Sequence, residues 1–209
     1  MSSSSQPLLK ADGSAAQVAL AGGFAYVSEK SGSLEAFALG ADGNLIGAAT
    51  AVAGIPAGTI VGITGAEDLI VAPVAHLASN FNQAAIPVAS GEALVQLVPT
   101  KEVAACWTAH DDDHVCVDNP GSMTVSCGHI GRGGFTSYTS AAASPAGDAV
   151  FDLSMRKGLV GIQAARSGTA MLLVYARADE DSDFLTLVNE FPIGAATASG
   201  ALLLPALSR

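Results

Sequence analysis

The chain has 209 residues, of which half are apolar, 13% are charged and 23 are glycine. Its 9 basic residues are outnumbered by 19 acidic ones, and the net charge of −10 would repel nucleic-acid phosphates and anionic membrane surfaces, so neither partner is expected. This length suits one domain, and the mixture of small aliphatic residues with glycine is typical of short strands joined by tight turns.

The first elements in chain order are two apolar strands in QVALAGGFAYVSEKSGS, from Gln17 to Ser33. Phe24 and Tyr26 lie two residues apart, as one face of a strand requires, and glycines mark the turns. A third and a fourth strand follow in LEAFALGADGNLIGAA. No basic region followed by an apolar run precedes these strands, so no signal peptide is expected; a mature secreted form would look the same.

Three further segments repeat this pattern of strand, polar turn and strand. They read TIVGITGAEDLIVAPVAHLAS, CWTAHDDDHVCVDNPGS and VFDLSMRKGLVGIQAARSG, and each continues with a third and a fourth strand. Equivalent positions at Val27, Val71, Val117 and Ile162 are 44, 46 and 45 residues apart. Four antiparallel strands in about 45 residues form one blade of a β-propeller, so the sequence predicts an all-β propeller of four blades.

These repeats define the predicted organisation of a single propeller-like domain, 1–209. Its units are 15–57, 58–103, 104–147 and 148–192, and ALLLPALSR supplies a closing strand within 198–209. Pairing of this strand with QPLLK near the N-terminus would close the ring and remove exposed strand edges.

The amino-acid sequence of the third and fourth units, from ACWTAHDDDHVCVDNPGSMTVSC to FLTLVNEF, resembles that of the lactonase-type β-propellers. This family includes 6-phosphogluconolactonases and carboxy-muconate cyclases. The first unit, GGFAYVSEKSGSLEAFALGADGNLIG, fits the same template. The resemblance implies a central pocket for a small carboxylate. That family has seven blades in about twice this length, so the four units imply either a compact ring or a half-ring completed by a second copy or a partner protein.

The turns between second and third strands gather on the pocket face of a propeller. Here they contribute Glu29, Lys30, His76, Asp118, Asn119 and Arg166. Opening of a lactone needs a proton donor or acceptor and a cation for the substrate's carboxylate or phosphate. His76 would be the acid/base and Arg166 or Lys30 the anion clamp. The loops entering the inner strands add Asp148 as a ligand-binding candidate but lack the family's histidine element.

The run HDDDH, from His110 to His114, offers two imidazoles and three carboxylates to a metal. Its spacing matches no zinc or calcium loop, and a hairpin splays such side chains apart, so a solvated turn is expected and no metal site is predicted. The acidic run ADEDSD, from Ala178 to Asp183, also lacks a calcium-loop spacing. No cofactor is predicted.

All three cysteines lie between Ala105 and Cys127. Cys116 and Cys127 flank one turn, so they form either a disulfide or a pair of small buried residues, and the compartment stays open between a reducing cytosol and an oxidising exterior. A nucleophilic dyad of Cys127 with His129 is a third alternative.

Two functions remain open. The missing pocket histidines and the short ring favour a non-catalytic binding or scaffold protein that self-associates. The alternative is an enzyme that hydrolyses a lactone or cyclises a muconate-like carboxylate.

Overall fold

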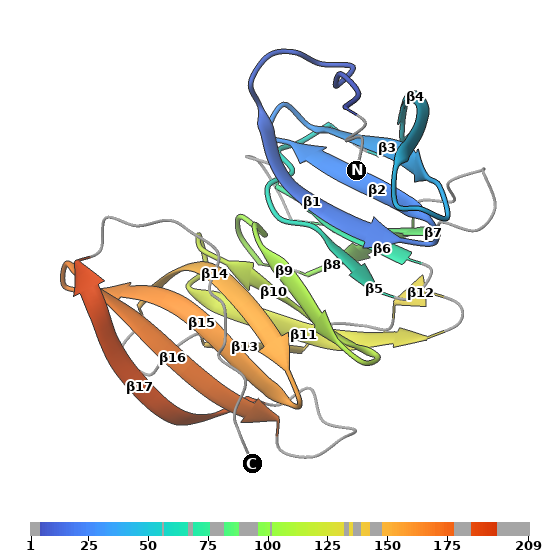
Figure 1. The fold of residues 1–209 in the computed structure, drawn as a ribbon. Helices are drawn as coiled ribbons and strands as arrows, with labels where there is room; N and C mark the ends of the chain where they lie inside the picture. The colour runs from blue at the N-terminus through green and yellow to red at the C-terminus, as the bar shows by residue number, and fades with distance from the viewer. Residues whose placement is uncertain are drawn as a thin grey trace.

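The computed structural model describes residues 5–55, 57–66, 69–75, 82–87, 96–100, 102–131, 134–135, 139–142, 148–177 and 185–195. These residues form strands and turns, and among them no helix could cross a membrane. The strands build four separate antiparallel sheets, which we call blades 1 to 4 (Figure 1). The predicted all-β propeller fold is confirmed.

Each blade is a meander in which strands adjacent in sequence pair. Blade 1 contains β1 (Ala15–Ala21), β2 (Phe24–Glu29), β3 (Ser33–Leu39) and β4 (Leu45–Ala51). Blade 2 contains β5 (Thr64–Ala66), β6 (Leu69–Val74), β7 (Asn82–Pro87) and β8 (Gln96–Pro99). Blade 4 contains β14 (Ala149–Arg156), β15 (Leu159–Arg166), β16 (Thr169–Arg177) and β17 (Leu185–Ala195).

Blade 3 differs from the expected four strands. It contains β9 (Thr108–Asp111), β10 (His114–Asn119), β11 (Thr124–Gly131), β12 (Gly134–Phe135) and β13 (Thr139–Ala142). Both β12 and β13 pair with β11, at its end and at its beginning respectively. The outer position of this blade is therefore filled by two short strands, because eight-residue β11 is longer than either partner.

The hairpin turns explain much of the glycine content. The chain turns in two residues at Gly22–Gly23, Lys157–Gly158 and Ser167–Gly168, and all six of these residues have positive φ. Two-residue turns with positive φ at both positions match the right-handed twist of the strands they join. The turn chemistry and the strand alternation thus specify the same meander.

Apolar clusters lie between successive blades. Blades 1 and 2 share a core that includes Tyr26, Leu34 and Ile70, and blades 3 and 4 share one that includes Cys116, Ile162 and Leu173. Blades 2 and 3 meet through Val71 and Val115. Each sheet inside the arc is therefore stabilised by burial on both faces.

Gly62 marks how closely blades 2 and 3 approach. Its N–H donates to the carbonyl of Cys106 at 2.9 Å, and a Cβ at this position would lie 2.7 Å from the Cα of Trp107. Only glycine fits this backbone contact, which fixes the linker entering β5 against the linker entering β9.

The blades form an open arc. Inner strands β1, β5, β9 and β14 follow one another, and each blade packs against the next. Blade 1 and blade 4 stand at opposite ends in Figure 1, and their described strands do not pack together. The predicted closing strand, 198–209, lies outside the described residues.

Candidate functional site

Arg166, the predicted anion clamp, is the last residue of β15, and its guanidinium forms ion pairs with two carboxylates of the protein. Its Nε and Nη2 donate to Asp148 at 2.7–3.1 Å, and its Nη1 and Nη2 donate to Glu190 at 3.0 and 2.9 Å. The Asp148 side chain is buried. Hydrogen bonds to Asp148 and Glu190 raise the pKa of Arg166, and the bond from Arg166 lowers the pKa of Glu190. The guanidinium is thus neutralised within blade 4.

The other predicted ligand-binding residues serve the strands on which they lie. Glu29 is fully buried and accepts a 2.6 Å hydrogen bond from the Ser33 hydroxyl. Asn119 is also fully buried and donates from Nδ2 to Thr124 and Ser126. These bonds tie the second strand of a blade to the third, as a structural side chain does.

Asp118 is held inside the molecule with one carboxylate oxygen bonded. Its Oδ1 accepts a 2.7 Å hydrogen bond from the backbone N–H of Trp107, and its Oδ2 has no partner among the described residues. Burial, with a smaller contribution from Asp152, raises the pKa of Asp118 to about 8, although the backbone hydrogen bonds oppose this. This raised pKa favours the protonated form of Asp118 at neutral pH, and its Oδ1 anchors the entrance to β9.

The predicted pocket residues do not form a contact group in the described structure. The Lys30 side chain is exposed in blade 1, whereas Arg166 is paired in blade 4. His76, the proposed acid/base, lies outside the described residues. The described part of the chain thus contains no assembled acid, base and free cation of the kind that lactone opening needs.

Cys116 and Cys127 are direct partners across β10 and β11, and they form a disulfide with an S–S distance of 2.03 Å. Direct rather than diagonal pairing is what brings the sulfur atoms together. A bonded Cys127 has no thiolate, so it supplies no nucleophile for a dyad with His129. Cys106 has a free thiol whose pKa is raised to about 12 by burial and by Asp118.

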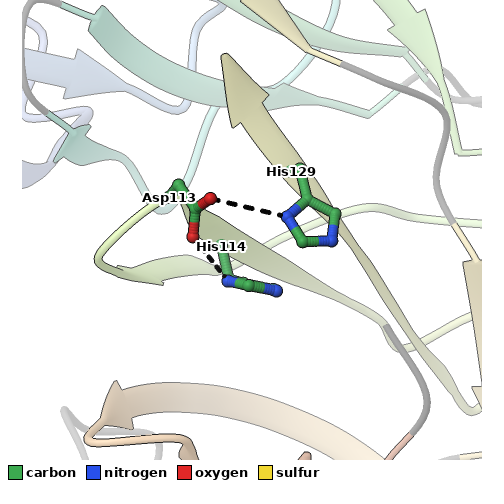
Figure 2. Close-up of side chains that lie close together, drawn as sticks. All are labelled: Asp113, His114 and His129. Carbon is green, nitrogen blue, oxygen red and sulfur yellow. Dashed lines mark ion pairs between the residues drawn. The ribbon is translucent and has the colours of Figure 1, made fainter. Parts of the chain in front are cut away.

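A cluster that the spacing did not predict lies at the other end of the same strands. His114 and His129 are direct partners on β10 and β11, two positions before Cys116 and two after Cys127, so they share the disulfide's face of blade 3. Their ring centroids are 3.9 Å apart. Figure 2 shows the Asp113 carboxylate beside the two rings, with one oxygen toward each: its Oδ1 lies 2.8 Å from Nδ1 of His114, and its Oδ2 lies 3.8 Å from Nδ1 of His129.

The three side chains differ in exposure and charge. The His114 side chain is 2% exposed, His129 is 26% exposed and Asp113 is 62% exposed, so the cluster opens to solvent through Asp113. Burial lowers the pKa of His114, and Arg177 and His129 lower it further against the effect of Asp113. Partial burial raises the pKa of Asp113, but the imidazoles and hydrogen bonds outweigh it and the net direction is downward. A neutral imidazole beside an ionised carboxylate is therefore the favoured state.

His110, the other histidine of the HDDDH run, is separated from this cluster by its position on β9. Its Nδ1 lies 2.8 Å from the Thr64 hydroxyl, across the contact between blades 3 and 2. Asp111 accepts from the backbone N–H of Gly158 at 2.7 Å and ties the turn to blade 4. The expected splaying of HDDDH is thus seen for these two residues. The sequence could have indicated the cluster only through the register that sets His129 opposite His114.

Comparisons with known proteins agree with the blades as observed. No protein-family model and no curated protein matches the sequence. Among solved structures, proteins assigned as 6-phosphogluconolactonases from Bacteroides fragilis and Bacteroides uniformis match 85% of this chain, with TM-scores of 0.61 and 0.66 at 15% and 16% identity. The computationally designed Ika4 protein matches 84% of this chain over 99% of its own, with a TM-score of 0.58 at 15% identity.

These likenesses define the fold class as a β-propeller. More particularly, the chain's blades are similar in fold to part of the two Bacteroides propellers. It spans 57% of the length of each of the two matched Bacteroides chains. At these identities the likeness concerns the fold alone, since propellers of one architecture carry many functions.

Proposed function

We propose that this protein is a non-catalytic propeller scaffold whose open arc binds a second copy of itself, head to tail, to complete a ring. The observation that carries the proposal is the apolar, solvent-exposed sheet face at the end of blade 4. A sheet face of this kind is normally covered in a propeller by the next blade.

The free face of blade 4 is built by β16 and β17. Leu173 and Tyr175 point into the core shared with blade 3, so the alternating Leu172 and Val174 face away from it. Phe191 on β17 pairs with Leu172 and is 45% exposed. Val188 and Ile193, on the same outer strand, are also exposed.

Blade 1 offers the complementary end of the arc. Tyr26 and Leu34 face blade 2, whereas Val18 and Leu20 on β1 are 60% and 65% exposed. Within the arc, each blade presents one face to the blade before it and the other to the blade after it. The exposed face of blade 1 is the one that would contact a preceding blade, and the exposed face of blade 4 is the one that would contact a following blade. Faces of these two kinds pack together at every contact within the arc, which favours head-to-tail pairing of two arcs.

The ion pairs of Arg166 support a binding role over catalysis. A lactonase must hold a substrate anion, but Arg166 already bonds to two carboxylates. Displacing either one would break its ion pair with Arg166, and Asp148 is buried. Breaking the ion pair of a buried charge is unfavourable.

The molar mass in solution tests the proposal directly. We expect a particle of twice the 20.7 kDa chain mass by light scattering coupled to size exclusion. Phe191→Glu should convert it to a monomer that keeps its circular dichroism. Met123→Glu is the matched control, because Met123 is equally exposed, at 45%, but lies before β11 of blade 3, away from both ends.

A wild-type monomer at millimolar concentration would overturn the proposal, as would equal effects of the two variants. The enzyme alternative makes a different prediction: turnover of a lactone or a muconate-like acid that His76→Ala abolishes. Such turnover would replace the scaffold function by the lactonase one.

A further inference from the structure

We propose that Asp113, His114 and His129 form a binding site for a divalent transition-metal ion of the Zn²⁺ class. Each residue offers one ligand atom, and these atoms all lie within 4.8 Å of one another. This site lies at the end of blade 3 that carries the turn between β9 and β10. The proposal is independent of ring completion by the free faces of blades 1 and 4.

The donor set determines the kind of ion. Two imidazole nitrogens and one carboxylate oxygen suit zinc, cobalt, nickel or copper, whereas calcium and magnesium prefer all-oxygen sites. Three protein ligands leave a coordination position for water, as in open zinc sites. Because Asp113 is 62% exposed, that position would face solvent.

The distances allow a metal after a small movement. Bonds of about 2.0–2.1 Å in a tetrahedral site place ligand atoms roughly 3.3 Å apart, so separations of up to 4.8 Å must close by at most about 1.5 Å. The two histidines are fixed by strand pairing, but Asp113 lies on the turn between β9 and β10. The exposed Asp113 carboxylate can therefore adjust its own distances, and rotation of the imidazoles about their side-chain bonds can adjust the distance between them without disturbing the blade.

The surroundings of His114 favour its role as a ligand of the metal ion. Although His114 is nearly fully buried, neither ring nitrogen has a hydrogen bond to a described residue outside the cluster. A buried polar group usually has such a partner. Coordination would satisfy one nitrogen and hold two imidazoles that otherwise lie against each other at 3.9 Å.

Charged groups of both signs surround the site. Asp111, Asp112 and Asp113 follow one another in the sequence, and Arg177 is the cation that acts on His114. Arg156 and Lys157 precede the Gly158 N–H that bonds Asp111, so they are the other cations near the turn. The nearby charges are therefore balanced, and it is the Asp113 carboxylate within ligand distance of both imidazoles that favours a cation.

Titration calorimetry with Zn²⁺, in a buffer free of chelators and thiols, tests the site on the full chain. We expect one ion per chain, with no comparable binding of Mg²⁺. Asp113→Asn and His129→Ala should each weaken Zn²⁺ binding at least tenfold. Asp112→Asn is the matched control: it removes the same charge from the same turn, and its positive φ of 52° suits asparagine, so affinity should change less than threefold.

A second probe identifies the ligands. Co²⁺ should give the visible absorption of a nitrogen and oxygen site without a thiolate charge-transfer band, because Cys116 and Cys127 are bonded and Cys106 is a half-buried thiol whose pKa is raised to about 12. Equal losses for Asp112→Asn and Asp113→Asn would indicate a diffuse acidic turn and overturn the proposal. So would Zn²⁺ binding that survives His129→Ala, or no binding by the folded wild-type protein.

Discussion

Replacement of Asp118 by asparagine should remove a pH-dependent destabilisation from the fold. Asp118 is completely buried on β10, and its Oδ1 accepts the N–H of Trp107. Asparagine has the same shape and keeps an oxygen for that bond, but it carries no charge. The substitution therefore tests whether the carboxylate is protonated in the folded protein.

The magnitude follows from the difference between the folded and unfolded pKa values. Burial, followed by the Asp152 charge among the factors that raise it, moves the pKa of Asp118 from 3.8 to about 8. Between these values the folded protein binds a proton that the unfolded chain has lost, so the stability of the wild type falls as pH rises. The slope for one proton is about 1.4 kcal/mol per pH unit, and the effect is complete above the folded pKa.

Urea unfolding of both proteins at intervals from pH 5 to pH 9 measures this effect. The difference in unfolding free energy, Asp118→Asn minus wild type, should rise by about 1.4 kcal/mol per unit up to pH 8 and then level off. The many other carboxylates cancel in the difference. Parallel curves for the two proteins would show that Asp118 is ionised when buried and would refute the reasoning.

Two further predictions concern cross-links between strands. The double substitution Cys116→Ala and Cys127→Ala should lower the unfolding free energy by about 3 kcal/mol, which is the chain-entropy value for closing an 11-residue loop. Urea unfolding monitored by fluorescence measures this loss, and a reductant should not change the stability of the double variant. Arg166→Gln should lower the melting temperature more than Glu190→Gln does, because it removes the ion pair of the buried Asp148, whereas Glu190→Gln removes only the pair with an exposed carboxylate. Equal shifts in calorimetry would contradict this.

The propeller could be predicted because its signal is local. Val27, Val71, Val117 and Ile162, taken as equivalent positions of the repeated pattern, all lie on the second strand of a blade, in β2, β6, β10 and β15. Alternation and turn residues act over a few positions, so they survive in a sequence with no matching family model. The outer edge of blade 3 was missed because pairing of β12 and β13 with one long strand depends on strand length and register.

The candidate site depended on contacts that spacing does not encode. Arg166 was interpreted as a free cation, but Glu190 reaches it from β17, where bulges shift the register of the outer strand. His129 was considered only as a partner of Cys127 on its own strand. Its position opposite His114 requires the register of β10 with β11, in which Cys116 opposes Cys127. A one-residue slip would have placed His129 on the other face.

Polar residues near the ends of the second strands can look functional in the sequence, but in the structure they hold the linkers that lead into the blades. Ser28 donates from its hydroxyl to the carbonyl of Val61, in the linker that enters blade 2. Asp118 holds the linker that enters its own blade, because it accepts the N–H of Trp107 just before β9. Linkers between blades have no regular strand partner, so their backbone groups need side chains. Polarity at the end of a second strand is therefore required by the architecture itself. The candidate ligand site lies instead at the start of β10, where His114 has no such backbone group to hold.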